Sequence, residues 1–317
     1  MPTHLVNSRV TPRFAGLVTF GRYPRLADIS PENCPADWII YGIPYDGGVT
    51  YRPGARFGPR AIREESQYLK PFSLAHGVNV CEKLSLADGG DAPVKPYSPH
   101  ENAQIAAEYA IAFPDPGRSR LLALGGDHSI AYANIRATWE RRGRPAGGLA
   151  LIHFDSHLDT VDAVWGEKWG HASPFIRAIE DGIINPRKMI SIGIKGPLNT
   201  GADLEYAARH GVTIVTREQL DGAGPALIQK FVSDLSGTEA YITFDVDVVD
   251  PAFAPGTGTP SIGGISSARA LDLLRLLKGV NVAGADVVEV LPDRDSAGIT
   301  ALLAAHVAFE VISLTAV

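Results

Sequence analysis

The chain has 317 residues, of which 45% are apolar and 20% charged, and its formal net charge is −6. This length suffices for one large α/β domain, and the acidic balance argues against nucleic acid or an anionic membrane surface as a partner. The two cysteines, Cys34 and Cys81, form no CxxC pattern, which argues against a disulfide framework or a thiolate zinc site. Free thiols and the lack of a basic-then-apolar leader in residues 1–20 predict a cytoplasmic protein.

Apolar runs alternate with helical segments along most of the chain. Residues 1–36 are irregular and rich in proline, which predicts a surface arm, and residues 37–317 are expected to form one domain. Strands are predicted, in chain order, at 38–43, 84–87, 121–124, 149–155, 189–194, 212–215, 240–246 and 282–290. Helices are predicted at 58–63, 98–113, 130–142, 173–181, 203–210, 225–235 and 267–277. This alternation is typical of an α/β fold in which helices cover both faces of a parallel sheet of about eight strands. The apolar segment 299–317 contains His306 and Glu310 and therefore predicts a buried helix, not a membrane span.

Three good metal ligands follow the apolar run at 149–155. Asp155, His157 and Asp159 occupy every second position, and alternate side chains of a strand leave the same face. We therefore expect all three to point into one space just past the end of the strand. Polar groups are costly to bury side by side unless something compensates them, and a divalent cation is the obvious compensation.

Other strand ends carry similar residues. His128 follows the strand at 121–124, Asp245 and Asp247 end the strand at 240–246, and Glu289 lies near the end of the last strand. Because ligands bind at the carboxyl ends of strands in parallel sheets, these side chains are expected to converge. The candidate metal ligands are His128, Asp155, His157, Asp159, Asp245 and Asp247. Four carboxylates and two imidazoles suit two ions about 3.5–4 Å apart, and this oxygen-rich set favours Mn²⁺, with Ni²⁺, Fe²⁺ or Co²⁺ as alternatives. A lone DxHxD or DxD motif more often caps a loop or forms ion pairs, but the joint occurrence of both favours metal.

Five blocks resemble the signature motifs of the ureohydrolase family, which comprises arginases, agmatinases and related amidinohydrolases. They are GGDHS (125–129), HFDSHLDT (153–160), HASPF (171–175), TFDVDVVDPAFAPGTGTP (243–260) and VEVLPDRDSAGIT (288–300). The segment YRPGARFGPRAIR (51–63) is most similar to the agmatinase, guanidinobutyrase and proclavaminate amidinohydrolase branch. The resemblance implies the three-layer α/β/α arginase-like fold and a binuclear Mn²⁺ centre. It also implies hydrolysis of a guanidino group to urea and an amine by a hydroxide held between the two ions, in a trimer or hexamer.

The resemblance also implies roles for individual residues. The six candidate ligands match the family's metal ligands, His171 matches its proton-shuttling histidine, and Glu289 matches the carboxylate that grips the guanidinium. Both roles are chemically reasonable, because imidazole titrates near neutrality and a carboxylate accepts two parallel N–H bonds from a planar fork. Asp127, His153 and Asp250 are expected to orient the ligands or the surrounding loops.

The sequence departs from the family pattern at three places. Ser156 replaces the usual alanine, Ala172-Ser173 replaces Gly-Thr, and the segment 292–295 replaces a loop that commonly carries tyrosine. The last change places Arg294 near the expected mouth of the site. One hypothesis is that Arg294 or Lys195 contacts the carboxylate of a guanidino acid; the alternative is that Arg294 pairs at the surface with Asp293 or Asp295. The substrate therefore stays open among agmatine, a guanidino acid such as 4-guanidinobutyrate, and a less common guanidine or biguanide.

Two other functions compete with this interpretation. A metal-dependent amide hydrolase such as a deacetylase shares the general fold, but it normally uses one zinc ion and fewer carboxylates. A non-catalytic metal-binding subunit could instead support an active homologue. The complete set of ligands, together with His171 and Glu289, argues against both alternatives.

Overall fold

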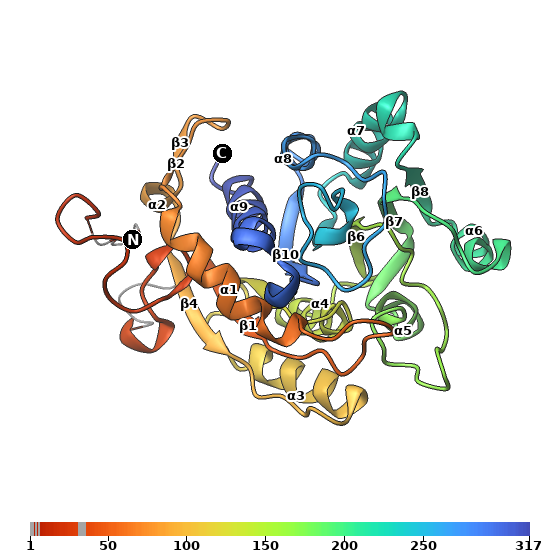
Figure 1. Cartoon of the computed structure of the whole chain (residues 1–317), viewed down its shortest axis with the longest axis horizontal. Coiled ribbons are helices and arrows are strands. Elements are labelled where there is room, and N and C mark those ends of the chain that lie inside the picture. Colours follow the sequence, from red (N-terminus) through yellow and green to blue (C-terminus); the bar gives the residue numbers. More distant parts are fainter. Residues whose placement is uncertain (1–2, 4, 6, 31–35) are drawn as a thin grey trace.

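The computed structural model describes residues 3, 5, 7–30 and 36–317. Its centre is an eight-stranded sheet in which all neighbouring strands are parallel, in the order β4-β1-β5-β10-β9-β6-β7-β8. The edge strands β4 and β8 lie on opposite sides of the molecule (Figure 1). The strands are β1 (Trp38–Ile43), β4 (Leu86–Asp91), β5 (Arg120–Gly125), β6 (Leu149–Phe154), β7 (Ile184–Ile194), β8 (Thr213–Thr216), β9 (Glu239–Asp245) and β10 (Asn281–Val288). The predicted parallel sheet of eight strands is confirmed.

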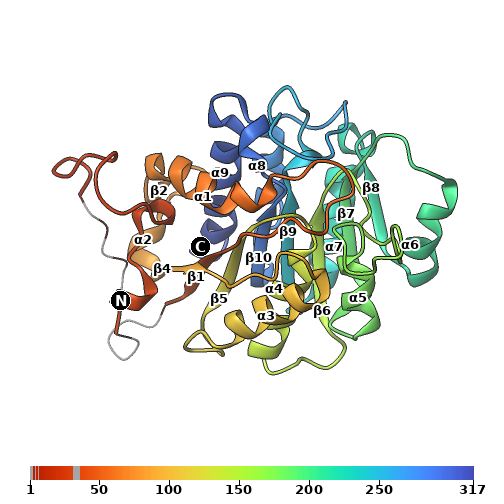
Figure 2. The same ribbon diagram turned by 60° about the horizontal axis from the view of Figure 1, so that its bottom comes forward.

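Helices cover both faces of the sheet, as Figure 2 shows. One face packs against α1 (Gly58–Glu65), α7 (Gly224–Leu235), α8 (Ser267–Arg275) and α9 (Ile299–Ser313). The other packs against α3 (Pro99–Ile111), α4 (Ile130–Arg141), α5 (Pro174–Glu180) and α6 (Glu205–His210). Proline at the first or second position begins four of these helices, α1, α3, α5 and α7, where its missing N–H costs nothing. The expected three-layer α/β/α architecture is confirmed.

The apolar helix near the end of the chain belongs to the core. The segment Ser296–Ser313 is long and apolar enough to cross a membrane, but 67% of it is buried in the fold. Helix α9 packs against α1, α8 and β10, and most of its side chains are buried. The prediction of a buried helix in this segment is confirmed.

Some elements differ from those predicted. A small hairpin of β2 (Phe72–Ser73) and β3 (Val78–Asn79), followed by the short helix α2 (Val80–Lys83), was not predicted, because strands of two residues leave no periodic pattern. Strand β7 begins at Ile184 rather than 189, because polar residues 185–188 mask its first half.

Part of the N-terminal segment packs against the domain. Phe20 is fully buried, and its amide donates to Asp88 Oδ2 at 2.7 Å, while the Gly21 amide donates to Ser66 Oγ at 2.8 Å. Cys81 is a buried free thiol. Cys34 and the neighbouring end of the predicted arm lie outside the described residues, so the domain boundary at residue 36 stays a prediction.

Candidate metal centre and active site

The candidate site lies where four neighbouring strands end. Strands β5, β10, β9 and β6 are consecutive in the sheet, and each is followed by one of the polar segments singled out in the sequence. Parallel strands place their carboxyl ends along one edge, so segments that are distant in the chain meet there. The topology therefore assembles His128, the 155–159 segment, the 245–247 segment and Glu289 in one place.

Tight turns, and not the alternation of side chains along a strand, bring the predicted ligands together. Strand β6 ends at Phe154, so Asp155 to Asp159 form a loop, with Asp159 in the left-handed region at a φ of 50°. The Asp155 carboxylate accepts the His157 amide at 2.6 Å, and Asp245 accepts the Asp247 amide at 2.8 Å. Aspartate favours such turns, because its side chain can bond the amide two residues further on. The explanation from strand periodicity was wrong, although the convergence that it predicted is present.

Two groups of possible ligands share one carboxylate. His128, His153, Asp155 and Asp159 form one group, and Asp155, His157 and Asp247 form the other; within each group the ligand atoms lie within 4.8 Å of one another. Asp155 thus stands between the groups, as a carboxylate that bridges two ions would.

The two imidazoles that were predicted as ligands each face carboxylate oxygens. His128 Nδ1 lies 3.0 Å from Asp155, 2.8 Å from Asp159 and 3.3 Å from Asp245. His157 Nδ1 lies 3.0 Å from Asp247 and 3.3 Å from Asp155. All six sequence-predicted ligand residues are therefore within one connected cluster.

The electrostatics of the cluster fit bound cations. Burial, reinforced by the neighbouring Asp247 and Asp155, raises the pKa of Asp245 well above its usual range, and burial also raises the pKa of Asp247. His128 Nδ1 is buried and has no hydrogen-bond partner, although it faces three carboxylate oxygens. The four predicted carboxylates, of which Asp155, Asp245 and Asp247 repel one another, and the two predicted imidazoles are the donor set that hard or borderline dications take up. The cluster can hold metal ions.

The three residues that were expected to orient the ligands or the surrounding loops bond to a ligand or to nearby backbone. His153 Nε2 lies 2.8 Å from Asp155 Oδ2 and its Nδ1 lies 3.1 Å from Ser191 Oγ, so it is part of the first group and also steadies its shared carboxylate. Asp127 accepts the Gly48 amide at 2.8 Å, which ties the loop before α1 to the site. Asp250 accepts three backbone amides of its own loop, from Ala252, Gly263 and Gly264.

His171 and Glu289 form a pair beside the cluster. His171 Nδ1 lies 2.8 Å from Glu289 Oε1, which also accepts the His128 amide at 2.9 Å, whereas the buried Glu289 Oε2 has no partner. In the neutral form of His171, Nε2 accepts the Thr50 amide at 3.0 Å and the proton lies on Nδ1. Burial lowers the pKa of His171, but the charge and hydrogen bond of Glu289, together with the charges of Asp127 and Asp159, outweigh it and raise that pKa to about 9. The doubly protonated form is therefore favoured at neutral pH; its Nε2 proton displaces the Thr50 amide and can be donated to the Thr50 hydroxyl, 2.7 Å away.

The two cations suggested for a substrate carboxylate lie elsewhere. Lys195 is buried, and its ammonium donates to the Ser156 hydroxyl and, at 2.7 Å, to the Asp247 carbonyl oxygen. Lys195 thus ties the ends of β6 and β9 together beneath the ligands, and Ser156 is its anchor. Arg294 is exposed, and no ion pair with Asp293 or Asp295 is formed in the described structure; Asp295 instead caps α9 by accepting two of its amides, from Thr300 and Ala301.

A cavity of about 500 Å³ opens over the cluster. It is reached by His157, Asp159, Asp245 and His171, and its outer wall is largely apolar, with Leu158, Val161, Val164, Trp165 and Leu198. Neither Lys195 nor Arg294 lines it, and its described lining contains no lysine or arginine. Asp203, which also accepts the Thr200 amide, supplies a further carboxylate.

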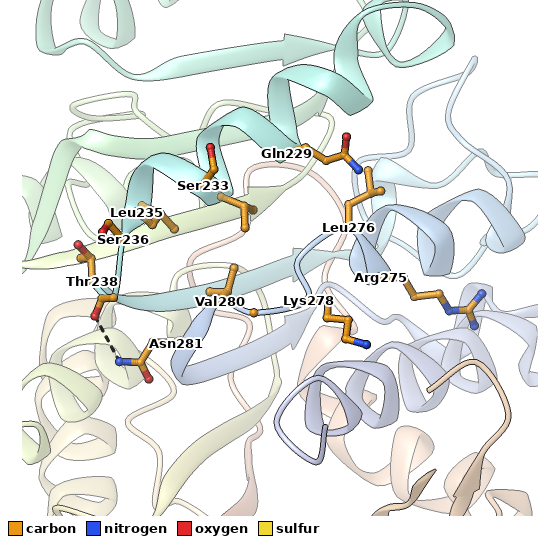
Figure 3. Close-up of a pocket in the computed structure, with 13 residues that line it drawn as sticks. Gln229, Ser233, Leu235, Ser236, Thr238, Arg275, Leu276, Lys278, Val280 and Asn281 are labelled. Carbon is orange, nitrogen blue, oxygen red and sulfur yellow. Dashed lines mark hydrogen bonds between the residues drawn. The ribbon is translucent and has the colours of Figure 1, made fainter. Parts of the chain in front are cut away.

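A larger cavity lies at the other end of the sheet and lacks comparable chemistry. Figure 3 shows this groove of about 640 Å³ beside α7, formed partly by residues 236–238 and 278–281, which precede β9 and β10. Its described lining contains no histidine, aspartate, glutamate or cysteine. Size alone would have selected the wrong end of the molecule.

Comparisons with known proteins agree with this geometry. The family model described as "Arginase family" matches residues 36–313. This chain belongs to the arginase family. It is 37% identical to proclavaminate amidinohydrolase of Streptomyces clavuligerus, over 97% of this chain and 96% of that protein, and 38% identical to guanidinopropionase of Pseudomonas aeruginosa, over 96% and 93%. The solved structure of the Streptomyces clavuligerus enzyme superimposes with a TM-score of 0.88 at 36% identity, covering 96% of this chain and 99% of that one. The ureohydrolase resemblance noted in the sequence is confirmed.

Sequence reasoning missed three residues of the site. Thr50 bonds His171, while Thr243 and Asp286 lie beneath His128. Thr50 stands in an irregular loop with no motif to mark it. Thr243 stands two residues before Asp245, where no pattern marks it. Asp286 is a lone acid in an apolar strand, and this alone could have indicated its role, since a fully buried carboxylate needs partners.

Proposed function

We propose that the protein is a binuclear-metal amidinohydrolase, which hydrolyses the guanidino group of a small molecule to urea and an amine. The observation that carries the proposal is the shared Asp155 between two ligand groups, with the His171–Glu289 pair beside them. The named relatives that act on guanidino compounds, a guanidinopropionase and a guanidinobutyrase among them, support the same reaction class.

The proposed metal pair is Mn²⁺, with Ni²⁺ as the alternative. The six residues that would hold it are His128, Asp155, His157, Asp159, Asp245 and Asp247, an oxygen-rich set with one or two nitrogens for each ion. When bound, such ions lower the pKa of water from 15.7 to about 7 and so supply a nucleophile at neutral pH.

The chain's own residues would then bind the substrate and move a proton. Glu289 is buried and is not part of the described cavity lining, but its Oε1 holds the lining residue His171, and its unpartnered Oε2 would accept a guanidinium N–H. Expulsion of the amine requires a proton, and His171 lines the cavity; burial lowers its pKa, but Glu289, Asp127 and Asp159 together raise it to about 9. Once Nε2 is released from the Thr50 amide it can carry that proton to the leaving nitrogen.

The cavity walls favour a substrate tail without negative charge. Once cations neutralise Asp159 and Asp245, Asp203 is the remaining carboxylate of the lining, and no lysine or arginine opposes it there. We therefore infer that agmatine, or an uncharged alkyl guanidine or biguanide, suits the cavity better than 4-guanidinobutyrate. The earlier hypothesis that Lys195 or Arg294 binds a substrate carboxylate has no support in this geometry.

The setting of the enzyme is likewise a proposal. Family resemblance supports a homo-oligomer, a trimer or hexamer, and the free thiol of Cys81 supports a cytoplasmic location, although some relatives are named mitochondrial. The acidic net charge of −6 supports the expectation that neither nucleic acid nor a membrane is a partner.

A urea-release screen over a panel of guanidines, after loading the purified protein with Mn²⁺ or Ni²⁺, tests the proposal. Urea from at least one guanidine would support it and would exclude a purely supporting subunit. Release of acetate from acetylated amines with one zinc ion for each chain would favour the deacetylase alternative instead. Silence toward every guanidine, with two ions bound, would favour the non-catalytic subunit.

A further inference from the structure

A buried chain of hydrogen bonds runs from His128 into the sheet. His128 Nε2 lies 2.8 Å from Thr243 Oγ1, and the Thr243 hydroxyl donates to Asp286 Oδ1 at 2.6 Å. The Tyr241 hydroxyl donates to the other oxygen, Asp286 Oδ2, at 2.6 Å. All four side chains are at most 1% exposed, and they contact one another directly.

This series of hydrogen bonds continues from Tyr241 to Asn134 and Tyr41, away from the site. Asn134 Nδ2 donates to the Tyr241 hydroxyl oxygen at 2.5 Å and to the Ala285 carbonyl oxygen at 2.8 Å, and Asn134 Oδ1 accepts the Tyr41 hydroxyl at 2.8 Å. Both polar atoms of the Asn134 side chain are therefore committed, and the amide cannot be flipped without placing Oδ1 against the Ala285 carbonyl oxygen, acceptor against acceptor. This fixes Tyr241 as an acceptor from Asn134 and a donor to Asp286.

The carboxylate at the centre of the chain sets the order of the protons. Burial raises the pKa of Asp286, but both of its oxygens accept a hydroxyl proton, from Tyr241 and from Thr243, which is the pattern of an ionised carboxylate. The single proton of Thr243 is thus used on Asp286. Thr243 Oγ1 then has only lone pairs to offer to His128, and Nε2 must carry the proton of that bond. The opposite nitrogen, Nδ1, is the atom that faces Asp155, Asp159 and Asp245 without a hydrogen bond of its own.

We propose that Asp286, acting through Thr243, is a positioning residue that holds His128 in the tautomer whose Nδ1 lone pair is free for a metal ion. The inference rests on the metal site of the proposed function, but not on its substrate. His157 has no such support in the described structure: its side chain is 39% exposed, and only its Nδ1 contacts carboxylates. The Asp286–Thr243 pair therefore orients a ligand of only one group, the group that contains His128.

The isosteric variant D286N tests the proposal. Its amide can donate to Thr243 Oγ1, which frees the Thr243 proton for His128 Nε2 and moves the imidazole proton to Nδ1. Partners that orient metal-ligating histidines are typically worth about 10–100-fold in metal affinity. We expect D286N to weaken one of the two Mn²⁺ affinities by about that factor and to leave the other unchanged, as measured by electron paramagnetic resonance of free Mn²⁺ during titration of chelator-treated protein.

Two further variants separate positioning from general stability. Y241F removes the other donor to Asp286 but leaves the Thr243 bond, so it should lower the melting temperature without weakening either ion. T243S keeps the hydroxyl and should retain both affinities, whereas T243V should behave like D286N. Wild-type Mn²⁺ affinities in D286N, or equal losses in D286N and Y241F, would overturn the proposal. If all variants bind Mn²⁺ as expected and none releases urea, the hydrolase function fails while this inference stands.

Discussion

The two ends of the central sheet carry cavities of similar size and opposite character. At the carboxyl ends, four adjacent strands deliver histidines and carboxylates into a cavity of about 500 Å³. At the amino ends, a groove of about 640 Å³ has no histidine or carboxylate in its described lining. The difference teaches that the direction of the strands, and not the volume of a cavity, predicts where the reactive side chains gather, because a parallel sheet aligns the carboxyl ends of all its strands.

The largest effect is expected from the carboxylate shared by both ligand groups. Asp155→Asn removes a ligand from each group and should lower kcat/KM by on the order of 10³-fold or more, since metal-assisted attack supplies several kcal/mol. The metal content should fall for both ions. The control is Asp250→Asn, whose carboxylate holds only backbone amides nearby and which should retain both ions. Full metal content and activity in Asp155→Asn would contradict the bridging role.

Loss of the proton donor should be the next largest effect at this end. His171→Asn should lower kcat by about 10²–10⁴-fold, the range for a positioned acid or base, without loss of metal. Steady-state kinetics together with metal analysis of the same sample measure this. Activity within a few-fold of wild type would show that the proton reaches the amine by another route.

Substrate charge should give a moderate effect that reports on the cavity wall. We expect kcat/KM to be about five- to tenfold higher for agmatine than for 4-guanidinobutyrate, because one charge near a partly exposed carboxylate is worth about 1 kcal/mol. Competition between the two compounds in one urea assay gives the ratio directly. A preference for 4-guanidinobutyrate would mean that a cation outside the described lining recognises the carboxylate.

The Ser156 anchor should affect stability more than chemistry. Ser156→Ala removes an acceptor from the buried Lys195 ammonium and should cost about 1.5 kcal/mol in the free energy of unfolding, the scale of a hydrogen bond to a charged group. Denaturant unfolding measures it. Ser173→Ala is the matched control, because the buried Ser173 hydroxyl has no hydrogen-bond partner. Equal costs in the two variants would show that Lys195 does not depend on Ser156.

The smallest effect is expected at the amino-end groove. Gln229→Ala changes an exposed residue of α7 that lines only this groove, and such surface substitutions usually shift stability by no more than about 0.5 kcal/mol. Its kcat/KM should equal that of the wild type. A clear loss of activity would couple the two ends of the sheet and break the contrast between them.

Much of the fold was predictable, because the deciding signals are local. Apolar runs such as 149–154 are buried on both faces and give an unmistakable pattern of a central strand. The gathering of the ligands was also predictable from strand polarity. The turns that place Asp155 and Asp245 could not be predicted, because a DxH or DxD sequence occurs both in aspartate turns and at the ends of strands.

Other parts of the site depend on contacts between distant segments. Lys195 looks like a surface cation near the mouth, yet it bonds Ser156 and Asp247 from 39 and 52 residues away. Thr50 reaches His171 across 121 residues, and His128 reaches Thr243 across 115. No periodicity or spacing in one sequence encodes such pairs, so these roles required the structure.

Anomalous diffraction at the manganese edge, from crystals of Mn²⁺-loaded protein, tests the central claim most directly. We expect two peaks for each chain, one on either side of Asp155, with His128 beside one and His157 beside the other. A single peak, or peaks away from the carboxyl ends of β5, β6 and β9, would contradict the assignment of a binuclear hydrolytic site.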